Sequence, residues 1–193
     1  MDFKFLIHTV KILILNPVKE WDTVHSENKT AEYFSRNLFF PLLIPGSVSS
    51  FLGSFLFTNT ELSNAYSVMT GVKYFLLLSV VIYGTSFIFR EITSASGFVR
   101  DFNLSFRIIA CSAVPLLLCQ IVSRLFESFI FINILSLFGL YILWTGIGKM
   151  INPPERKKSF LMISTAVTFI ALLSVTDWIL NLLFDKIYFS IFA

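Results

Sequence analysis

The sequence predicts an all-α integral membrane protein with five transmembrane helices and an N-terminal amphipathic helix at the membrane interface. Its 193 residues are 55% hydrophobic and 14% charged, whereas a soluble domain carries about 25% charged residues. Five apolar stretches each approach the length of about 20 residues that a helix needs to cross a bilayer. Basic residues gather on alternate connections between these stretches. We therefore expect one integral membrane domain with little chain outside the bilayer.

Residues 1–37 are expected to form an amphipathic N-terminal segment on the cytoplasmic side. Lys4, His8 and Lys11 recur at helical spacing within the apolar residues 3–15 and make one polar stripe, a pattern typical of a helix lying in the interface. The pair Asn16-Pro17 ends this helix, because a residue before proline disfavours the α conformation. Aromatic side chains farther along are expected to anchor at headgroup level; they are Trp21, Tyr33 and Phe34.

Residues 38–193 are predicted to form the transmembrane domain, with a first span at 38–58 and a second, after a polar loop at 59–71, at 72–92. Pro41 and Pro45 lie in the opening turns of the first span, where proline is tolerated or kinks the helix. Small residues at four-residue spacing allow another helix to approach closely; they are Gly46, Ser50 and Ser54, and also Ser49 and Gly53. We expect this face to pack inside one bundle, with self-association through it as the alternative.

Three further spans complete the predicted bundle. The central one, at 104–125, carries Pro115 near its middle. The fourth, at 129–148, follows a tight turn and contains Gly139 and Gly146, which are seven residues apart and are candidates for close helix packing. The fifth covers 159–180 and follows a loop with two consecutive prolines, which cannot be helical throughout. A short amphipathic tail is expected after it.

The distribution of Lys and Arg predicts which end of the bundle faces the cytoplasm. Twelve of the fifteen basic residues lie before the first span, in or beside the connection between the second and third, or between the fourth and fifth. The other three are Lys73, Arg124 and Lys186. Positively charged residues of short loops stay on the cytoplasmic side. We therefore expect a cytoplasmic N-terminus and, after five spans, a C-terminus on the far side.

Polar side chains near the outer ends of the spans form the candidate polar cluster. The span centres contain no ionisable residue, which argues against a proton-coupled transporter or a voltage sensor. Lys73, Arg124 and Asp177 are expected at similar depth. We hypothesise that Asp177 pairs with one of the two basic residues inside the bundle; the alternative is that each charge reaches the headgroups alone. Gln120 and Asn133 lie near the same end and are expected to form interhelical hydrogen bonds rather than a binding site.

The sequence contains no recognisable pattern for catalysis, a cofactor or a metal ion. Its two histidines, His8 and His25, lie outside the spans, and it has no H-E-x-x-H, G-x-S-x-G or glycine-rich phosphate loop. Cys111 and Cys119 are eight residues apart on one predicted helix, which is too far for a disulfide. The small net charge of +3 is not the footprint of a nucleic-acid partner. We expect a protein that is not an enzyme, needs no cofactor or metal and binds no nucleic acid.

Several short motifs, in order along nearly the whole chain, resemble bacterial membrane proteins of the Yip1 family. The opening run from Asn16-Pro17 to Trp21 is similar to the family's L-N-P-x-x-E-W, and further matches lie around Pro41 and Pro45, around Pro115, and at 141–146 and 152–158. Cys111 and Gly148 depart from the family pattern. The resemblance implies a five-span protein with its N-terminus inside and no known reaction. The Phe-, Ile-, Lys- and Asn-rich composition favours a bacterial inner membrane.

Two functions follow from this architecture. The first is a non-enzymatic protein that organises or binds partners in the bilayer, namely membrane lipids, other membrane proteins or a second copy of itself. The second is a transporter or channel for a small or lipidic solute. Such a protein needs a cavity between spans, which we expect near Pro115, Gln120 and Asn133. A dry, fully packed centre would count against it. The missing catalytic groups disfavour an intramembrane enzyme.

Overall fold

A computed structural model of the chain describes residues 2–27, 29–57 and 63–192, and every regular element in these ranges is a helix. In chain order the elements are α1 (Phe3–Leu15), α2 (Pro17–Glu27), α3 (Ala31–Phe34), the π-helical turn η1 (Ser35–Phe39), α4 (Phe40–Phe57), α5 (Ser63–Ala95), α6 (Phe102–Ser112), α7 (Val114–Leu125), the 3₁₀ helix η2 (Glu127–Leu137), α8 (Phe138–Met150) and α9 (Glu155–Phe192). The predicted all-α class is confirmed.

Long apolar helices make up most of the described chain. Four segments are long and apolar enough to cross a membrane by themselves: Ala31–Phe57, Asn64–Ala95, Ser128–Met150 and Glu155–Ile187. Helices α6 and α7 meet at an angle of 42° and make a fifth crossing if the bent pair is counted as one span. These segments support the predicted membrane protein, with the bent pair in the place of the central span.

The first span begins at Ala31 rather than at residue 38. The hydroxyl of Thr30 caps the helix by accepting a hydrogen bond from the backbone N–H of Tyr33. The π-helical turn η1 ends at Phe39, two residues before Pro41. Proline lacks a backbone donor and crowds the carbonyl of the preceding turn, and a widened turn accommodates both effects. The helix therefore continues through both prolines to Phe57, and residue 58, the predicted end of the span, lies outside the described residues.

Helix α5 also begins earlier than predicted, at Ser63 instead of residue 72. The polar side chains that indicated a loop are compatible with a helix, since Thr70 Oγ1 donates a hydrogen bond to the carbonyl of Tyr66 at 2.9 Å. The helix then runs to Ala95 and buries Val81 and Ile82 completely. The predicted loop is wrong from Ser63 onward, and its residues 59–62 lie outside the described ranges.

The central span is broken at Ala113, between α6 and α7. Pro115 is in the first turn of α7, where its missing N–H leaves no helical hydrogen bond unmade. The backbone N–H of Ala113 still bonds to the carbonyl of Ile109, and that of Leu117 bonds to the carbonyl of Ala113. The proline thus causes a bend of 42° and not a loop.

The last two spans differ from prediction at their ends. The fourth begins as the 3₁₀ helix η2 directly after the extended residue Phe126, and continues as α8. Helix α9 runs for 38 residues without a break, because residues 155–192 contain neither glycine nor proline. The predicted fifth span at 159–180 and the short tail expected after it therefore belong to one continuous helix.

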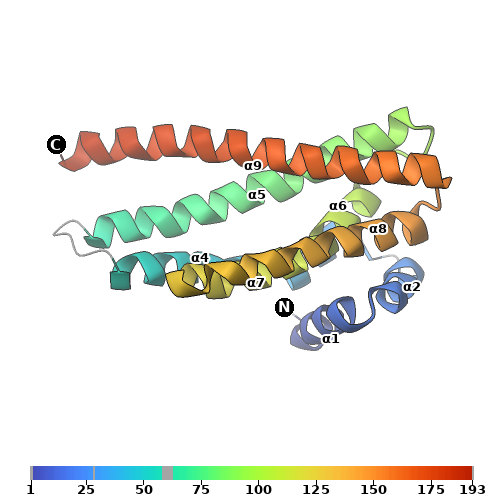
Figure 1. The fold of residues 1–193 in the computed structure, drawn as a ribbon, viewed down its shortest axis with the longest axis horizontal. Helices are drawn as coiled ribbons and strands as arrows, with labels where there is room; N and C mark the ends of the chain where they lie inside the picture. Colours follow the sequence, from blue (N-terminus) through green and yellow to red (C-terminus); the bar gives the residue numbers. More distant parts are fainter. Residues whose placement is uncertain (1, 28, 58–62, 193) are drawn as a thin grey trace.

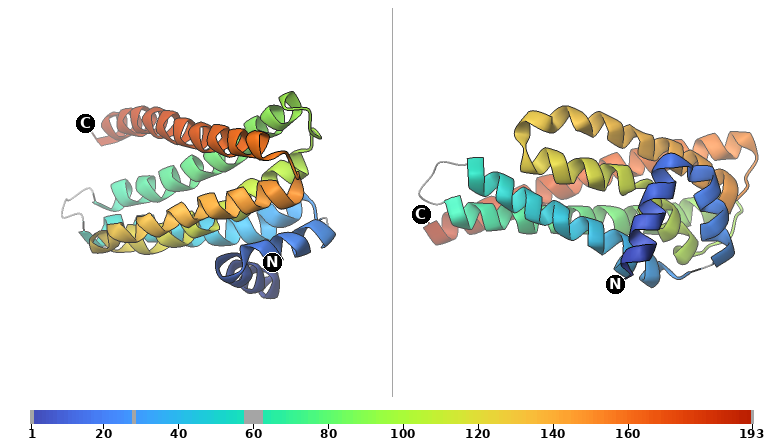
Figure 2. Two further views of the ribbon diagram at one scale, coloured as in Figure 1. Left: turned by 45° about the vertical axis from the view of Figure 1, so that its right-hand side comes forward. Right: turned by 90° about the horizontal axis from the view of Figure 1, so that it is seen from below.

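The helices form an elongated bundle in which α5 lies between α9 and α4, and α4 packs against α7 (Figure 1). Helix α2 and the α5–α6 and α8–α9 links lie at one end, here called the N-terminal end, and α1 lies beside the bundle, set back from that end toward the middle. The C-terminal ends of α4, α7 and α9 lie at the other, here called the C-terminal end. Helix α1 lies across the long axis of the bundle (Figure 2, right).

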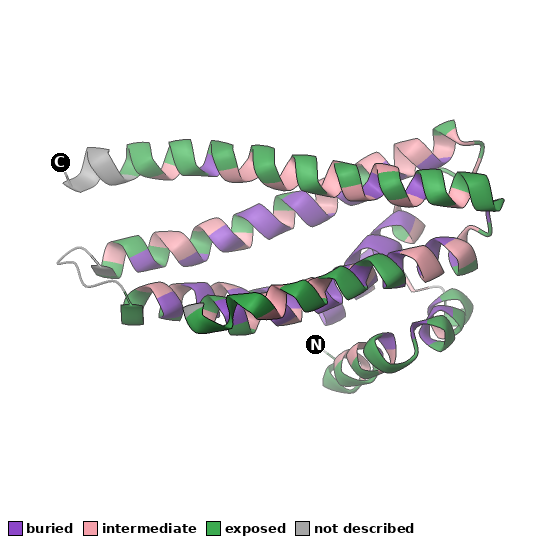
Figure 3. Ribbon diagram, viewed as in Figure 1, coloured by how far each residue is buried: buried purple, intermediate pink, exposed green. Residues whose placement is uncertain are grey.

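Burial is concentrated in the middle of the bundle and at its N-terminal end. The central turns of α5 and most of α6 are buried, whereas α9 is exposed along most of its length (Figure 3). The largest fully buried side chains include Trp21, Phe34, Phe39, Phe89 and Phe106. The expected headgroup positions of Trp21 and Phe34 are therefore wrong, because both rings are enclosed by protein.

Candidate functional site

Trp21 of α2 packs against α8 and hydrogen-bonds to it. Its indole Nε1–H donates to the backbone carbonyl of Ile142 at 3.1 Å and lies 3.2 Å from the hydroxyl oxygen of Thr145. The ring lies on Gly146, where an added Cβ would come within 2.5 Å of Trp21 Cζ2. Gly146 therefore accommodates this indole instead of a second membrane helix, which corrects the predicted helix-packing role of that glycine.

The Asn16-Pro17 pair sets the start of α2. The side-chain oxygen of Asn16 accepts a hydrogen bond from the backbone N–H of Lys19, and Pro17 occupies the first helical position. An asparagine cap and a proline at the first helical position both favour the start of a helix. The two residues of the family motif thus end α1 and direct α2 so that Trp21, one turn farther on, reaches α8.

Glu20 is buried in the joint between α1 and α2. Only 2% of the residue is exposed, and Glu20 Oε2 has no hydrogen-bond partner among the described residues; the same holds for the nearby Thr9 Oγ1. Burial raises the pKa of the Glu20 carboxyl above its ordinary value, and the neighbouring Thr9 and His8 oppose this only in part. The ionised carboxylate therefore works against the folded state.

Replacing Glu20 with glutamine is expected to raise the thermal midpoint of unfolding at pH 8. The pKa of the Glu20 carboxyl is higher in the folded protein than in the unfolded chain, where it is near 4.5. The contribution of this carboxyl to stability is therefore fully present below pH 4.5 and is lost as the pH rises through its pKa in the folded protein. The gain of the variant over the wild type, about 1 kcal/mol, should thus shrink at acidic pH. Glu32→Gln, at an exposed carboxylate, is the control. A Glu20→Gln protein less stable than the wild type at every pH would contradict this.

The predicted small-residue face packs inside the bundle. Added Cβ atoms would meet the ring of Tyr74 at Gly46, the backbone carbonyl of Arg124 at Gly53 and that of Ser112 at Gly139. Ser54 Oγ accepts a hydrogen bond from Ser67 Oγ at 3.3 Å. The first two glycines therefore bring α4 close to α5 and α7, as expected for packing within one copy of the chain.

The five residues of the predicted polar cluster separate into two groups at the C-terminal end. In the first, Lys73 Nζ lies 2.7 Å from Asp177 Oδ1 and donates to Asn181 Oδ1, which links α5 to α9. In the second, Arg124 Nε donates to Gln120 Oε1 at 3.0 Å, and Gln120 Nε2 donates to Asn133 Oδ1 at 3.3 Å. One of the two hypothesised pairings of Asp177 is thus formed, at a partly exposed site and not inside the bundle as hypothesised. Gln120 and Asn133 make the interhelical bond expected of them.

The second group lines a polar cavity of about 620 Å³ between α4, α5, α7 and η2. We call it the polar cavity. Its lining residues include Ser50, Ser54, Thr70, Gln120, Ser123, Arg124 and Asn133. It lies near two of the three positions predicted for a cavity, whereas Pro115 is not part of it. The small residues at four-residue spacing in the first span and the polar residues of the third span both line this cavity. The sequence analysis treated them as separate features.

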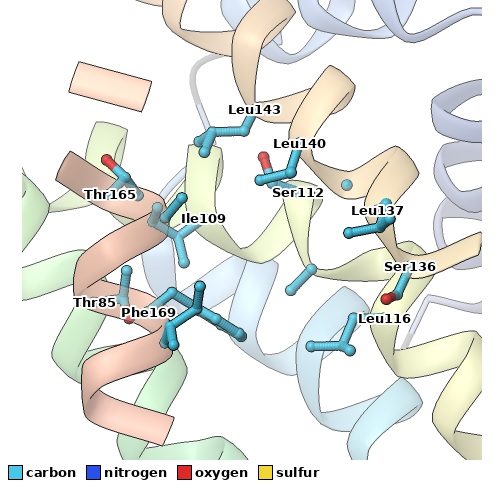
Figure 4. Close-up of a pocket in the computed structure, with 14 residues that line it drawn as sticks. Thr85, Ile109, Ser112, Leu116, Ser136, Leu137, Leu140, Leu143, Thr165 and Phe169 are labelled. Carbon is cyan, nitrogen blue, oxygen red and sulfur yellow. The ribbon is translucent and has the colours of Figure 1, made fainter. Parts of the chain in front are cut away.

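A second cavity, of about 310 Å³, lies between α5, α6, α7, η2, α8 and α9; we call it the apolar cavity (Figure 4). Its lining is dominated by side chains such as Ile109, Leu116 and Phe169. Thr85 also lines it, and Thr85 Oγ1 is buried without a hydrogen-bond partner in the described chain. Sequence reasoning missed this cavity; the only signal was the presence of isolated hydroxyls within apolar spans.

Comparison with known proteins identifies one family. The family model described as Yip1 domain matches residues 11–176 of the chain. No curated protein and no solved structure matches it. The matched range includes Trp21, the prolines of the first and central spans and the residues of both cavities. With a match over most of its length, the chain belongs to the Yip1 family of membrane proteins.

Proposed function

We propose that this membrane protein is a non-enzymatic lipid-binding protein that holds an acyl chain in the apolar cavity. The observation that carries the proposal is the cavity itself. Its volume of about 310 Å³ is at the lower end of the range for ligand pockets, and apolar linings with a few polar groups are usual for such pockets. An acyl chain requires this apolar surface and no catalytic group.

The position of the cavity supports a ligand that enters from the bilayer. Helices α8 and α9 approach each other near their link at the N-terminal end and diverge toward the other end (Figure 1). Leu140 of α8 and Ile170 of α9 both line the cavity, so it lies where these helices separate. The acyl chain of a bilayer lipid would fill the space between the diverging helices and make van der Waals contacts with both of them.

The proposed orientation places the N-terminal end of the bundle in the cytoplasm. Helix α2 and the two links that carry basic residues, α5–α6 and α8–α9, lie at that end (Figure 1), which is the distribution expected of cytoplasmic segments. In a bacterial inner membrane, α1 would then lie along the cytoplasmic surface, with Lys4 and Lys11 exposed to anionic headgroups. The C-terminus would be on the far side.

Filling the apolar cavity is expected to abolish lipid retention. Ala166 lines the cavity, and Phe in its place adds a ring to the space that the lipid would occupy. The wild-type protein, released from nanodiscs of native lipids and examined by native mass spectrometry, should keep one lipid through delipidation. Ala166→Phe should lose it.

Val167→Phe provides the matched control, because Val167 is the next residue of α9 and points away from the bundle with 59% of its surface exposed. It should keep the lipid as the wild type does. A wild-type protein that keeps no lipid, or an Ala166→Phe protein that keeps as much, would contradict the proposal. A stoichiometric protein partner captured by crosslinking in place of lipid would favour the organising role instead.

The polar cavity favours transport of a small or lipidic solute as the second candidate. It is larger than the apolar cavity and is lined by amides and hydroxyls. A transporter moves its solute between the two membrane faces, whereas a binding protein only retains it. Transfer of a fluorescent lipid between the leaflets of liposomes that depends on the protein would therefore favour transport, and retention without transfer would favour binding.

A further inference from the structure

We propose that the polar cavity binds a phosphate group, with Arg124 as its charged donor. This inference goes beyond the binding of an acyl chain and does not depend on it. Arg124 is the only charged residue of the described cavity lining. The carboxylate of Asp177 is paired with Lys73 at 2.7 Å, and neither residue lines the cavity. The cavity therefore presents a single positive charge.

The hydrogen-bond network fixes the orientation of the two amides. A guanidinium can only donate, so the Gln120 atom that lies 3.0 Å from Arg124 Nε is the oxygen. The Gln120 nitrogen then donates to Asn133, whose atom facing it must be the oxygen. Ser123 Oγ donates to the same Asn133 Oδ1 at 3.1 Å.

The hydrogen bonds of this network occupy the acceptor oxygens of the two amides and leave several N–H donors of the described residues unoccupied. Both amide oxygens are engaged, Gln120 Oε1 by one donor and Asn133 Oδ1 by two. In the described chain, the guanidinium of Arg124 makes its hydrogen bond through Nε and also lies 5.5 Å from the ring centroid of Tyr74. Its terminal N–H groups and the amide nitrogen of Asn133 make no other hydrogen bond among the described residues. Fixed donors around one positive charge select an anion with several oxygen acceptors.

Phosphate has the matching chemistry. The planar fork of arginine binds two phosphate oxygens at once, and the hydrogen bond to Gln120 together with the Tyr74 ring restricts the guanidinium before a ligand arrives. Ser50 adds a hydroxyl in the lining whose oxygen is buried and has no partner within the described ranges. The phosphate can belong to a lipid headgroup or to a free anion, because the cavity lies at the C-terminal end of the apolar spans.

Calorimetric titration of the full-length protein tests the inference and separates the two sources. The protein is held in dodecyl maltoside, which contains no phosphate, and is titrated with sodium phosphate and, separately, with a short-chain phosphatidylglycerol. We expect binding that Arg124→Gln weakens about tenfold or more, because a charge-assisted hydrogen bond is lost. Arg124→Lys, which keeps the charge but not the fork, should weaken it less. The thermal midpoint of each variant is measured first to confirm folding.

Two further variants make the outcomes distinct. Lys186→Gln removes a positive charge from α9 at the same end of the bundle but outside the cavity, and should leave binding unchanged. Ala166→Phe should also leave inorganic phosphate binding unchanged, so failure of the acyl-chain proposal would not be mistaken for failure of this one. Binding of both titrants identifies phosphate itself as the ligand group, and binding of the lipid alone identifies a headgroup. A wild-type protein that binds neither, or an Arg124→Gln protein that binds as tightly, overturns the inference.

Discussion

Replacing Trp21 with alanine is expected to detach α1 and α2 from the bundle and to lower the free energy of unfolding by about 3–5 kcal/mol, the usual cost of truncating a buried tryptophan. The indole is fully buried, and its N–H bonds to the carbonyl of Ile142. The substitution therefore leaves a cavity above Gly146 and removes a hydrogen bond in a buried setting. Asp22 of α2 also forms an exposed ion pair with Lys149 of α8. Such a pair contributes little.

Hydrogen exchange and thermal unfolding in detergent check this prediction together. Backbone amides of residues 3–27 should lose protection in Trp21→Ala, and the midpoint of unfolding should fall. Trp178→Ala is the matched control, because Trp178 is 63% exposed on α9 and its removal leaves no internal cavity. A Trp21→Ala protein with unchanged exchange over residues 3–27 would show that α2 is held by other contacts.

The sequence predicted the helices better than their ends. Apolar stretches of sufficient length identified every long helix, because a span must satisfy its backbone internally. The predicted helix boundaries were wrong where capping and local hydrogen bonds determine the residue at which a helix begins. Thr30 starts the first span early, and Thr70 bonds to its own helix where polar residues indicated a loop. Pro115 causes the bend at Ala113, whereas the sequence analysis treated residues 104–125 as one continuous helix.

The candidate sites required contacts that a linear pattern does not contain. Trp21 was expected at the headgroups, because aromatic residues beside a span are frequent there; its partner Gly146 is more than a hundred residues away and was assigned to helix packing. The charge pattern did indicate a pair for Asp177, since opposite charges at similar depth attract. The apolar cavity depends on the divergence of α8 from α9 (Figure 1), which no spacing of residues predicts.

Substituting Gly53 with alanine is expected to push α4 away from α7 and to cost about 2–3 kcal/mol, the upper part of the range for overpacking. An added Cβ would collide with the backbone carbonyl of Arg124, and a backbone atom cannot move aside as the end of a side chain can. Gly84→Ala is the control, because the added Cβ at that helical glycine would meet only the end of the Leu172 side chain, at 3.1 Å. Alanine also favours a helix by about 1 kcal/mol over glycine, so Gly84→Ala should be neutral or stabilising.

Thermal unfolding of both variants in detergent, followed by circular dichroism, measures the difference. Equal midpoints for Gly53→Ala and the wild type would show that α4 and α7 can separate without cost. Gly53 also lines the polar cavity, beside the residue that is proposed to hold phosphate. Separation of α4 from α7 moves Ser50 away from Arg124, because the two residues belong to the two helices that are forced apart. Gly53→Ala should therefore weaken phosphate binding as well as the fold, whereas Gly84→Ala should leave phosphate binding unchanged and should not destabilise the fold.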